Sequence, residues 1–211
     1  MTQTHGESEA QPVLHPRDVV ETIGRVMPED TLFFCDIGNV TAWAIHYLSR
    51  QAPGTFFTDT VWGAMDYAIP AAIGAKLAQP DRPVCALVGD GGALMGSVLD
   101  LLTARQERAP IAVVVFNDGG WGMLEHGVAQ SPLRDQARPS FRFGVRVDFA
   151  QIARSLQAHG RHVTTPWELI AALQSAARPE RPMLLDVAID PAASPPIGGR
   201  TAHVNRHMHG H

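Results

Sequence analysis

The sequence has little cysteine and little charge. Two of its 211 residues are cysteines, and 18% are charged. Two thiols cannot build a disulfide-rich scaffold, and Cys35 and Cys85 both fall in apolar segments, so we expect reduced thiols buried in the core rather than redox-active ones. The formal net charge is −4 and no basic run stands out, so nucleic acid and anionic membranes are poor candidates for partners.

Long hydrophobic runs are absent as well. No apolar stretch reaches the length of a transmembrane helix, and residues 1–11 are too polar for a signal peptide, so we expect a cytoplasmic location. The apolar fraction of 45% is nevertheless large enough for a core without metal or disulfide support. A chain of 211 residues suits one α/β domain, which we place at 13–190, between a disordered N-terminus (1–12) and a loose Pro- and His-rich tail (191–211).

Short apolar segments alternate with amphipathic segments along the chain. This alternation predicts an α/β fold with a doubly wound parallel sheet and helices on both faces. The Arg-rich residues 129–147 show no clear period and are expected to form a long loop. We expect strands at 31–35, 55–58, 83–88, 111–116, 162–164 and 183–189, and helices at 16–27, 41–48, 68–78, 94–107, 121–126, 149–156 and 167–177.

Acidic and glycine-rich segments follow the two central strands. Gly89-Asp90-Gly91-Gly92 comes after the first, and Asn117-Asp118-Gly119-Gly120 comes after the second. A helix joins the two strands, so they form a parallel unit whose carboxyl ends lie side by side, where open α/β sheets bind ligands. Asp90 and Asp118 can then share one hard cation, while the glycine amides approach a phosphate group.

Two common glycine-rich motifs do not fit these residues. A dinucleotide fingerprint requires a third glycine where Leu94 stands, and the Gly-Lys-Ser/Thr sequence of a P-loop is absent. An ordinary tight turn after a strand remains an alternative.

The two segments together resemble the signature of thiamin diphosphate enzymes. Three further motifs occur in the order that this family has: Asp36-Ile37-Gly38-Asn39, the helix region Gly63–Ala75, and Gly120-Trp121-Gly122-Met123. On these motifs, residues 16–190 resemble the diphosphate-binding domain of enzymes similar to acetolactate synthase and 2-oxo-acid decarboxylases. The resemblance implies the thiamin diphosphate-binding fold, with thiamin diphosphate and Mg²⁺ as cofactors.

The resemblance also implies a metal site. Asp90, Asp118 and the backbone carbonyl of Gly120 are expected to bind Mg²⁺, and Asn117 is expected to orient the loop. Asp118 stands where the family usually has Asn. The additional negative charge could either tighten binding of the metal or weaken binding of the cofactor.

Three glycine-containing segments are expected to contact the cofactor itself. Backbone amides after Gly89, those of Gly91, Gly92 and Ala93, would meet the diphosphate, and position 92 lacks the Ser that many relatives carry. The loop of Ile37, Gly38 and Asn39 would meet the terminal phosphate, although Asp36 and Asn39 are also good caps for the next helix. The carbonyl of Gly63 would accept a hydrogen bond from the aminopyrimidine, while Met65 would hold the cofactor bent or belong to the core. The expected walls of the reaction pocket are Trp121, Met123 and Leu124, and Gly122 is expected to contact the cofactor.

The catalytic residue is missing from these motifs. In the family a glutamate of a separate pyrimidine-binding domain activates the cofactor, and Glu21, Glu107 and Glu168 are expected on solvated helix faces. We therefore expect a two-chain enzyme, in which a pyrimidine-binding subunit completes the site for decarboxylation or carboligation of a small 2-oxo acid. A non-catalytic cofactor-binding or regulatory subunit and an unrelated α/β domain are the alternatives.

Several other polar residues have two possible roles. Glu125 and His126 could donate protons, but solvated positions are favoured. The arginines of the predicted loop could receive an anionic group, with a solvated loop again favoured. The tail histidines could bind a metal, although a disordered tail is favoured. These arginines and histidines are Arg134, Arg138, Arg142, Arg146, His203, His207, His209 and His211.

Overall fold

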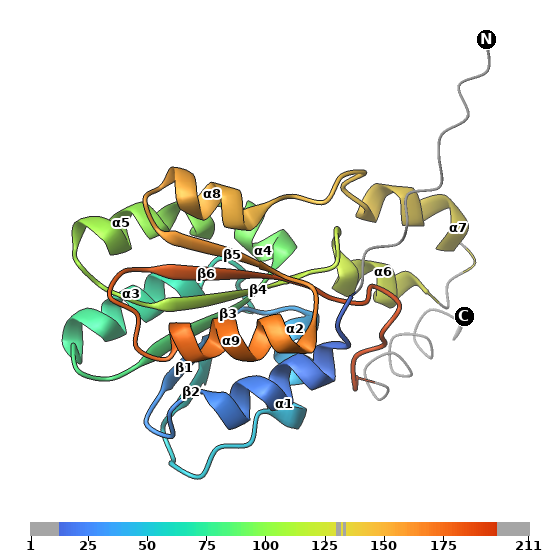
Figure 1. Cartoon of the computed structure of the whole chain (residues 1–211). Helices are drawn as coiled ribbons and strands as arrows, with labels where there is room; N and C mark the ends of the chain where they lie inside the picture. The colour runs from blue at the N-terminus through green and yellow to red at the C-terminus, as the bar shows by residue number, and fades with distance from the viewer. Residues whose placement is uncertain (1–12, 130–131, 133, 198–211) are drawn as a thin grey trace.

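The computed structural model describes residues 13–129, 132 and 134–197. These form a six-stranded, all-parallel sheet with the order β2-β1-β3-β4-β6-β5, which confirms the predicted α/β fold (Figure 1). The expectations for residues 1–12 and for the four tail histidines lie outside the described residues. The strands are β1 Leu32–Cys35, β2 Phe56–Thr58, β3 Val84–Gly89, β4 Ala112–Asn117, β5 His159–Val163 and β6 Met183–Ala188.

Helices cover both faces of the sheet. One core cluster packs α1, α2 and α9 against the strands, and the other packs α3, α5 and α8 against the opposite face. Figure 1 shows α5 and α8 on one side of the sheet and α1 and α9 on the other. Strands β3, β4 and β6 are apolar on both faces because both faces are covered, which is typical of parallel sheets. The helices are α1 Pro16–Val26, α2 Asn39–Tyr47, α3 Ala68–Ala78, α4 Asp90–Leu94, α5 Leu101–Gln106, α6 Gly122–Val128, α7 Arg134–Ala137, α8 Phe149–Ser155 and α9 Pro166–Ala176.

The chain changes direction across the sheet between β1 and β3. It leaves β1 toward β2 on one side and leaves β3 toward β4 on the other side. The loops at the carboxyl ends of these neighbouring strands therefore diverge and leave a crevice, the usual ligand site of open α/β sheets. The polar segments after β1, β3 and β4 all meet at this crevice, at the carboxyl ends of the strands.

The structure corrects three expected elements. The helix expected at 94–107 is interrupted: α4 ends at Leu94, and a 3-10 helix, Ser97–Asp100, precedes α5. The loop expected at 129–147 contains α7 and a second 3-10 helix, Arg138–Phe141. Strand β5 begins at His159 rather than at 162, because its first four residues are polar or small and lie at the sheet edge, where apolar patterning is weak.

The remaining helix and strand boundaries lie within two residues of the predicted ones. The cysteines are free and buried, as expected, and burial raises the pKa of both thiols. Among the described residues, no helix is long and apolar enough to span a membrane.

Candidate functional site

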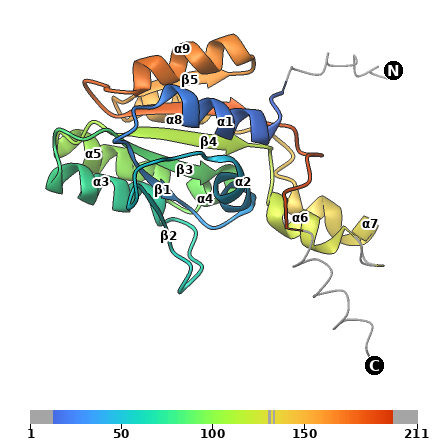
Figure 2. The same ribbon diagram turned by 90° about the horizontal axis from the view of Figure 1, so that it is seen from below.

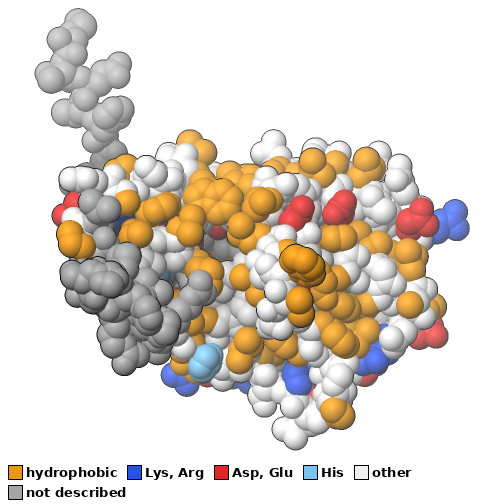
Figure 3. All heavy atoms as spheres, turned by 180° about the vertical axis from the view of Figure 1, so that it is seen from behind, with side chains coloured by type: hydrophobic (Ala, Val, Ile, Leu, Met, Phe, Trp, Pro, Cys, Tyr) orange, Lys and Arg blue, Asp and Glu red, His pale blue; other side chains and the backbone are white. Residues whose placement is uncertain are grey.

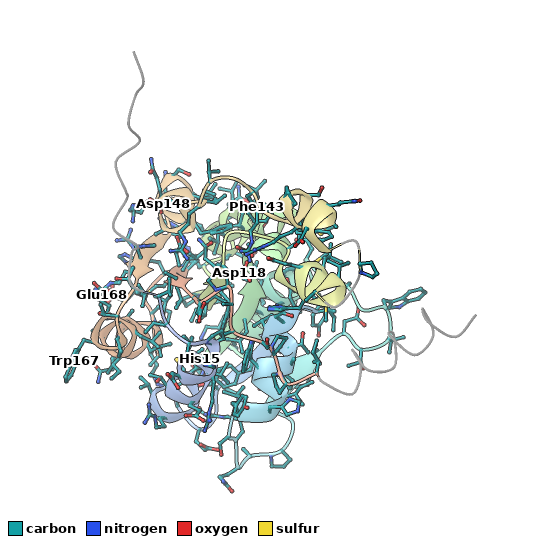
Figure 4. All side chains as sticks on the ribbon, turned by 90° about the vertical axis from the view of Figure 1, so that its right-hand side faces the viewer. His15, Asp118, Phe143, Asp148, Trp167 and Glu168 are labelled. Carbon is teal, nitrogen blue, oxygen red and sulfur yellow. The ribbon has the colours of Figure 1, made fainter. Side chains whose placement is uncertain are left out.

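A cavity of about 300 Å³ opens at the carboxyl ends of β1, β3 and β4. Figure 4 looks onto this edge of the sheet, with Asp118 near the middle of the view. Two residues predicted for the site, Ala93 and Asn117, do not line the cavity. The predicted residues that do line it are Ile37, Gly38, Asn39, Gly63, Met65, Gly89, Asp90, Gly91, Gly92, Asp118, Gly120, Trp121, Gly122 and Met123.

Asp90 joins the loops that follow β3 and β4. It stands directly after β3 and is 3% exposed. Its Oδ1 accepts a hydrogen bond from the Gly91 amide at 2.8 Å, and its Oδ2 accepts from the amides of Gly119 and Gly120 at 2.6 and 3.1 Å. Burial raises the pKa of Asp90 to about 6, although these amides favour the charged form.

Asp118 carries a buried oxygen without a hydrogen bond. Its Oδ1 is buried and accepts none, and the nearby Arg142 Nη1 is 3.6 Å away. Burial and the charge of Asp90 raise the pKa of Asp118 to about 7, while Arg142 acts in the opposite direction. A carboxylate oxygen that is kept from water and accepts no hydrogen bond has the chemistry of a ligand for a hard cation.

These residues fit a magnesium ion that is shared with a phosphate. Among the described residues, no three His, Cys, Asp or Glu side chains come together as a complete ligand set. Two carboxylates and the carbonyl of Gly120 would therefore leave positions for oxygens from another group, which is how Mg²⁺ is commonly bound beside phosphates.

The Asn117 side chain does not line the cavity; it links β4 to β6 and to the segment before α8. Its Nδ2 donates to Val147 O at 2.9 Å and to Asp186 Oδ1 at 2.8 Å. Asp186 is fully buried in β6 and also accepts from the Phe149 amide at 3.1 Å, at the start of α8. The sequence patterns did not point to Asp186, although a lone carboxylate within an apolar strand is a recognisable sign of a buried polar contact.

Asp36 caps a different helix from the one expected. Its Oδ1 accepts from the amides of Tyr67 and Ala68, and its Oδ2 accepts from the Asp66 amide, so it stabilises the N-terminus of α3 rather than that of α2. The same carboxylate restricts position 92. A Cβ added to Gly92 would lie 2.7 Å from Asp36 Oδ2, which explains why a residue without a side chain fits there.

Met65 lies at the rim of the cavity. It is 37% exposed and follows Gly63, whose φ of +68° is readily reached only without a side chain. The alternative that Met65 belongs to the core is therefore wrong. Cavity-lining residues that the sequence motifs did not assign to the site are Val40, Trp43, Phe116 and Ile189; three of them directly neighbour predicted motifs or strand ends.

Glu125 and His126 are not solvated surface residues, so the favoured interpretation is wrong. His126 is half-buried, and its Nδ1 lies 2.9 Å from Asn39 Nδ2. The Glu125 side chain is 16% exposed and pairs with Arg138 and Arg142. Burial lowers the pKa of His126, which favours the neutral ring.

The Arg-rich segment is also not simply a solvated loop. Arg142 and Arg146 donate to the backbone carbonyls of Asp118 and Asn117 at 2.7 and 3.0 Å. Arg138 is more exposed, and the side chain of Arg134 lies outside the described residues. Sequence spacing could not predict these contacts because they join residues that are 24 and 29 positions apart.

Residues 36–187 match the family model described as thiamine pyrophosphate enzyme, C-terminal TPP binding domain. The chain belongs to this family. Membership excludes the alternative of an unrelated α/β domain with a chance signature. Thiamine pyrophosphate is the thiamin diphosphate expected from the motifs, so the acidic and glycine-rich segments lie in a domain type that binds this cofactor.

Individual members of the thiamine pyrophosphate family cover most of the chain. It is 31% identical over 186 residues to a probable acetolactate synthase large subunit of Methanococcus aeolicus, covering 86% of this chain and 31% of the relative. It is 31% identical over 200 residues to the putative thiamine pyrophosphate-containing protein YdaP of Bacillus subtilis, covering 93% and 33%. The chain thus spans about a third of the length of these curated relatives.

One solved structure shares the fold of this chain. The thiamine diphosphate-dependent 4-hydroxybenzoylformate decarboxylase of Rhodococcus jostii RHA1 superposes with a TM-score of 0.74 at 22% identity. The match covers 92% of this chain and 36% of the decarboxylase, so the chain corresponds in fold to one part of that larger protein.

Proposed function

We propose that this chain binds the diphosphate and Mg²⁺ in a two-chain, thiamin diphosphate-dependent enzyme that decarboxylates or carboligates a small 2-oxo acid. The observation that carries the proposal is the meeting of Asp90 and Asp118 at neighbouring strand ends, beside a glycine-rich loop and in one cavity. When bound, the cofactor supplies an electron sink for the carbanion that decarboxylation leaves.

The residues of this chain bind and orient that cofactor. Asp90, Asp118 and the Gly120 carbonyl would hold Mg²⁺, and the amide of Gly92 would meet the diphosphate, whereas Ala93 lies outside the cavity. Asn39 can donate to the terminal phosphate if it releases His126. At the other end of the cavity, Met65 and the Gly63 carbonyl would hold the aminopyrimidine.

An exposed apolar surface supports the need for a partner. We call it the apolar rim; it lies on the loop 59–65 and on the segment around α4. The loop protrudes from the face that carries α3 and α4, where hydrophobic side chains gather (Figures 2 and 3). Exposed apolar surface of this kind marks interaction sites. The rim comprises Val61, Trp62, Met65, Leu94, Met95 and Leu99, of which Val61 and Trp62 are 86% and 88% exposed.

The composition of the cavity supports the identity of that partner. None of the described residues that line it is a glutamate. Thiamin diphosphate enzymes of the resembled class obtain the activating glutamate from a pyrimidine-binding domain, and such a domain would cover the apolar rim and close the cavity. We place it on a second polypeptide.

Calorimetric titration tests the proposal at the level of binding. The wild-type chain should bind thiamin diphosphate in the presence of Mg²⁺ and lose that binding in EDTA. Asp90→Ala should abolish the metal-dependent binding, because it removes one of two carboxylate ligands. Binding that persists unchanged in EDTA or in Asp90→Ala would overturn the site assignment.

Addition of the pyrimidine-binding partner tests the activity. Release of carbon dioxide from a 2-oxo acid by the mixture, and by neither chain alone, is the expected result. Cofactor binding without turnover in the mixture would instead identify a non-catalytic, cofactor-binding or regulatory subunit.

A further inference from the structure

The segment around Arg142 is paired with the loop that contains the candidate metal ligands. The Trp121 amide donates to Phe141 O at 2.7 Å, and the Phe143 amide donates to Gly119 O at 3.1 Å. These bonds form an antiparallel bridge between Gly120 and Arg142. A Cβ on Gly120 would lie 2.5 Å from Phe141 O, so the close pairing requires glycine at this position. Arg142 is thereby fixed beside Asp118 by the backbone.

The side chain of Arg142 connects the site to the surface through alternating charges. Its Nη1 donates to Asp118 O at 2.7 Å and lies 3.6 Å from Asp118 Oδ1. Its Nη2 pairs with Glu125 Oε2, and Glu125 Oε1 accepts from Arg138 at 2.8 Å. The Arg142 side chain is 25% exposed and Asp118 is 10% exposed, so solvent screens this ion pair only in part.

We propose that Arg142 is a positioning residue that compensates the additional negative charge of Asp118. One Asp and one Asn would carry a charge of −1 together, whereas Asp90 and Asp118 carry −2. The guanidinium of Arg142 adds +1 beside Asp118, and the charge of Glu125, which pairs with the same guanidinium, is matched by that of Arg138. The five side chains together carry −1. The site can then hold Mg²⁺ with two carboxylates without repelling the diphosphate more strongly than an Asp/Asn site does. The inference rests on the proposed function and concerns Asp118, one of the residues in which this chain departs from the usual motif of the resembled family.

This role also changes the interpretation of the arginine segment. Both ends of the Arg142 guanidinium are already engaged, one by the metal loop and the other by Glu125. Arg142 is thus already bound to groups of this protein, and it supports the loop 118–120 rather than binding a substrate anion. Arg146 donates to Asn117 O and so supports the same loop through its backbone.

A double-mutant cycle tests the compensation. The dissociation constant for thiamin diphosphate with saturating Mg²⁺ is measured by calorimetry for the wild type, Arg142→Gln, Asp118→Asn and the double variant. Arg142→Gln should weaken binding about tenfold, the effect of one partly desolvated charge pair. In the Asp118→Asn background the same change should have an effect of no more than about threefold, since no additional charge remains to compensate.

Matched controls separate this effect from a general change in charge. Arg178→Gln removes an equally positive side chain that is 63% exposed and paired with Asp30, and it should leave the dissociation constant unchanged. If Arg142→Gln weakens cofactor binding equally in both backgrounds, or in neither, the proposal for Arg142 is overturned. Metal-dependent binding by the wild type would in that case still uphold the proposed function. A wild type that binds no cofactor would overturn both.

A second cycle needs no cofactor. Thermal unfolding of the four ligand-free proteins should show that Arg142→Gln lowers the melting temperature more in the wild type than in Asp118→Asn, because only the wild type retains a carboxylate that the guanidinium stabilises. Equal shifts would contradict an interaction between the two side chains.

Discussion

Asp36 is buried behind the residues that line the cavity and holds one of their loops in place. It is fully buried and accepts hydrogen bonds from three consecutive amides, those of Asp66, Tyr67 and Ala68, and it does not line the cavity. Because these amides belong to the segment after Met65, the carboxylate fixes the loop that is proposed to hold the aminopyrimidine. Sequence spacing could not predict that Asp36 accepts hydrogen bonds from these amides, since 30 or more residues separate the donors from Asp36.

The loss of this carboxylate should destabilise the fold. Asp36→Ala leaves three amides at the start of α3 without their acceptor, and we expect a loss of about 3 kcal/mol in the free energy of unfolding. Asp148→Ala is the control: Asp148 caps α8 through one bond, and its side chain is 52% exposed, so its loss should cost about 1 kcal/mol. Urea denaturation measures both, and equal losses would contradict the role given to Asp36.

The pH dependence of the metal-free chain follows from Asp90 and Asp118. Burial raises the pKa of each in the folded state above the ordinary value of 3.8, so the folded chain binds more protons than the unfolded chain. The contribution of these two groups to stability is therefore present at low pH and is lost as the pH rises from about 4 to about 7. Binding of Mg²⁺ requires the charged forms and should strengthen over the same interval.

Unfolding of the wild type and of Asp90→Asn/Asp118→Asn across this pH range tests this dependence. The double variant should lose the part of the pH dependence that these carboxylates produce. An unchanged dependence in the double variant would show that other groups dominate it.

At the scale of elements, Gly96 determines where α4, the helix that begins at Asp90, stops. Its φ of +140° and ψ of −27° lie outside the region open to residues with side chains, and the backbone turns there between α4 and the 3-10 helix Ser97–Asp100. Helical spacing of apolar residues continues across this point, which is why periodicity predicted one uninterrupted helix. The apolar pattern predicts which side chains are buried, but it does not predict a local break in the backbone of the helix.

Replacement of Gly96 should therefore be costly. Gly96→Ala forces a side chain into this conformation, and we expect a loss of about 2 kcal/mol in the free energy of unfolding. Gly74→Ala is the matched control within α3, where a Cβ meets no atom within 4 Å, and it should stabilise the chain by about 0.5 kcal/mol. Chemical denaturation distinguishes the two, and a neutral Gly96→Ala would contradict the assigned break.

The predictable part of the molecule is the part that depends on local pattern. Strand periodicity and the motifs placed Asp90 and Asp118 at neighbouring strand ends, because parallel topology leaves little choice for where such ends lie. The short helices at 134–141 were missed because the segment is mostly polar, has no apolar period, and is ordered by contacts with α6. The ion pairs of Arg142 were missed for a related reason, since a distant segment must fold back before they exist.

At the scale of the whole molecule, the apolar rim should be the surface that meets the partner. Trp62→Asp should weaken association with the pyrimidine-binding chain by at least about tenfold, because an exposed aromatic anchor is replaced by a charge that the interface must desolvate. The free energy of unfolding should not change by more than about 0.5 kcal/mol, since the side chain is 88% exposed.

Trp167→Asp provides the control for this variant. Trp167 is 82% exposed on α9 and points away from the cavity edge (Figure 4). Its replacement should leave the association unchanged when both variants are compared by analytical ultracentrifugation. Equal weakening by the two variants would contradict the assignment of the partner to the apolar rim.

Native mass spectrometry of the untagged protein isolated from its own cells tests the two-chain arrangement most directly. We expect a complex that contains this chain, a second polypeptide, thiamin diphosphate and Mg²⁺. Fragmentation of that complex would also identify the polypeptide that supplies the activating glutamate. A homo-oligomer of this chain without cofactor or second polypeptide would contradict the proposed arrangement.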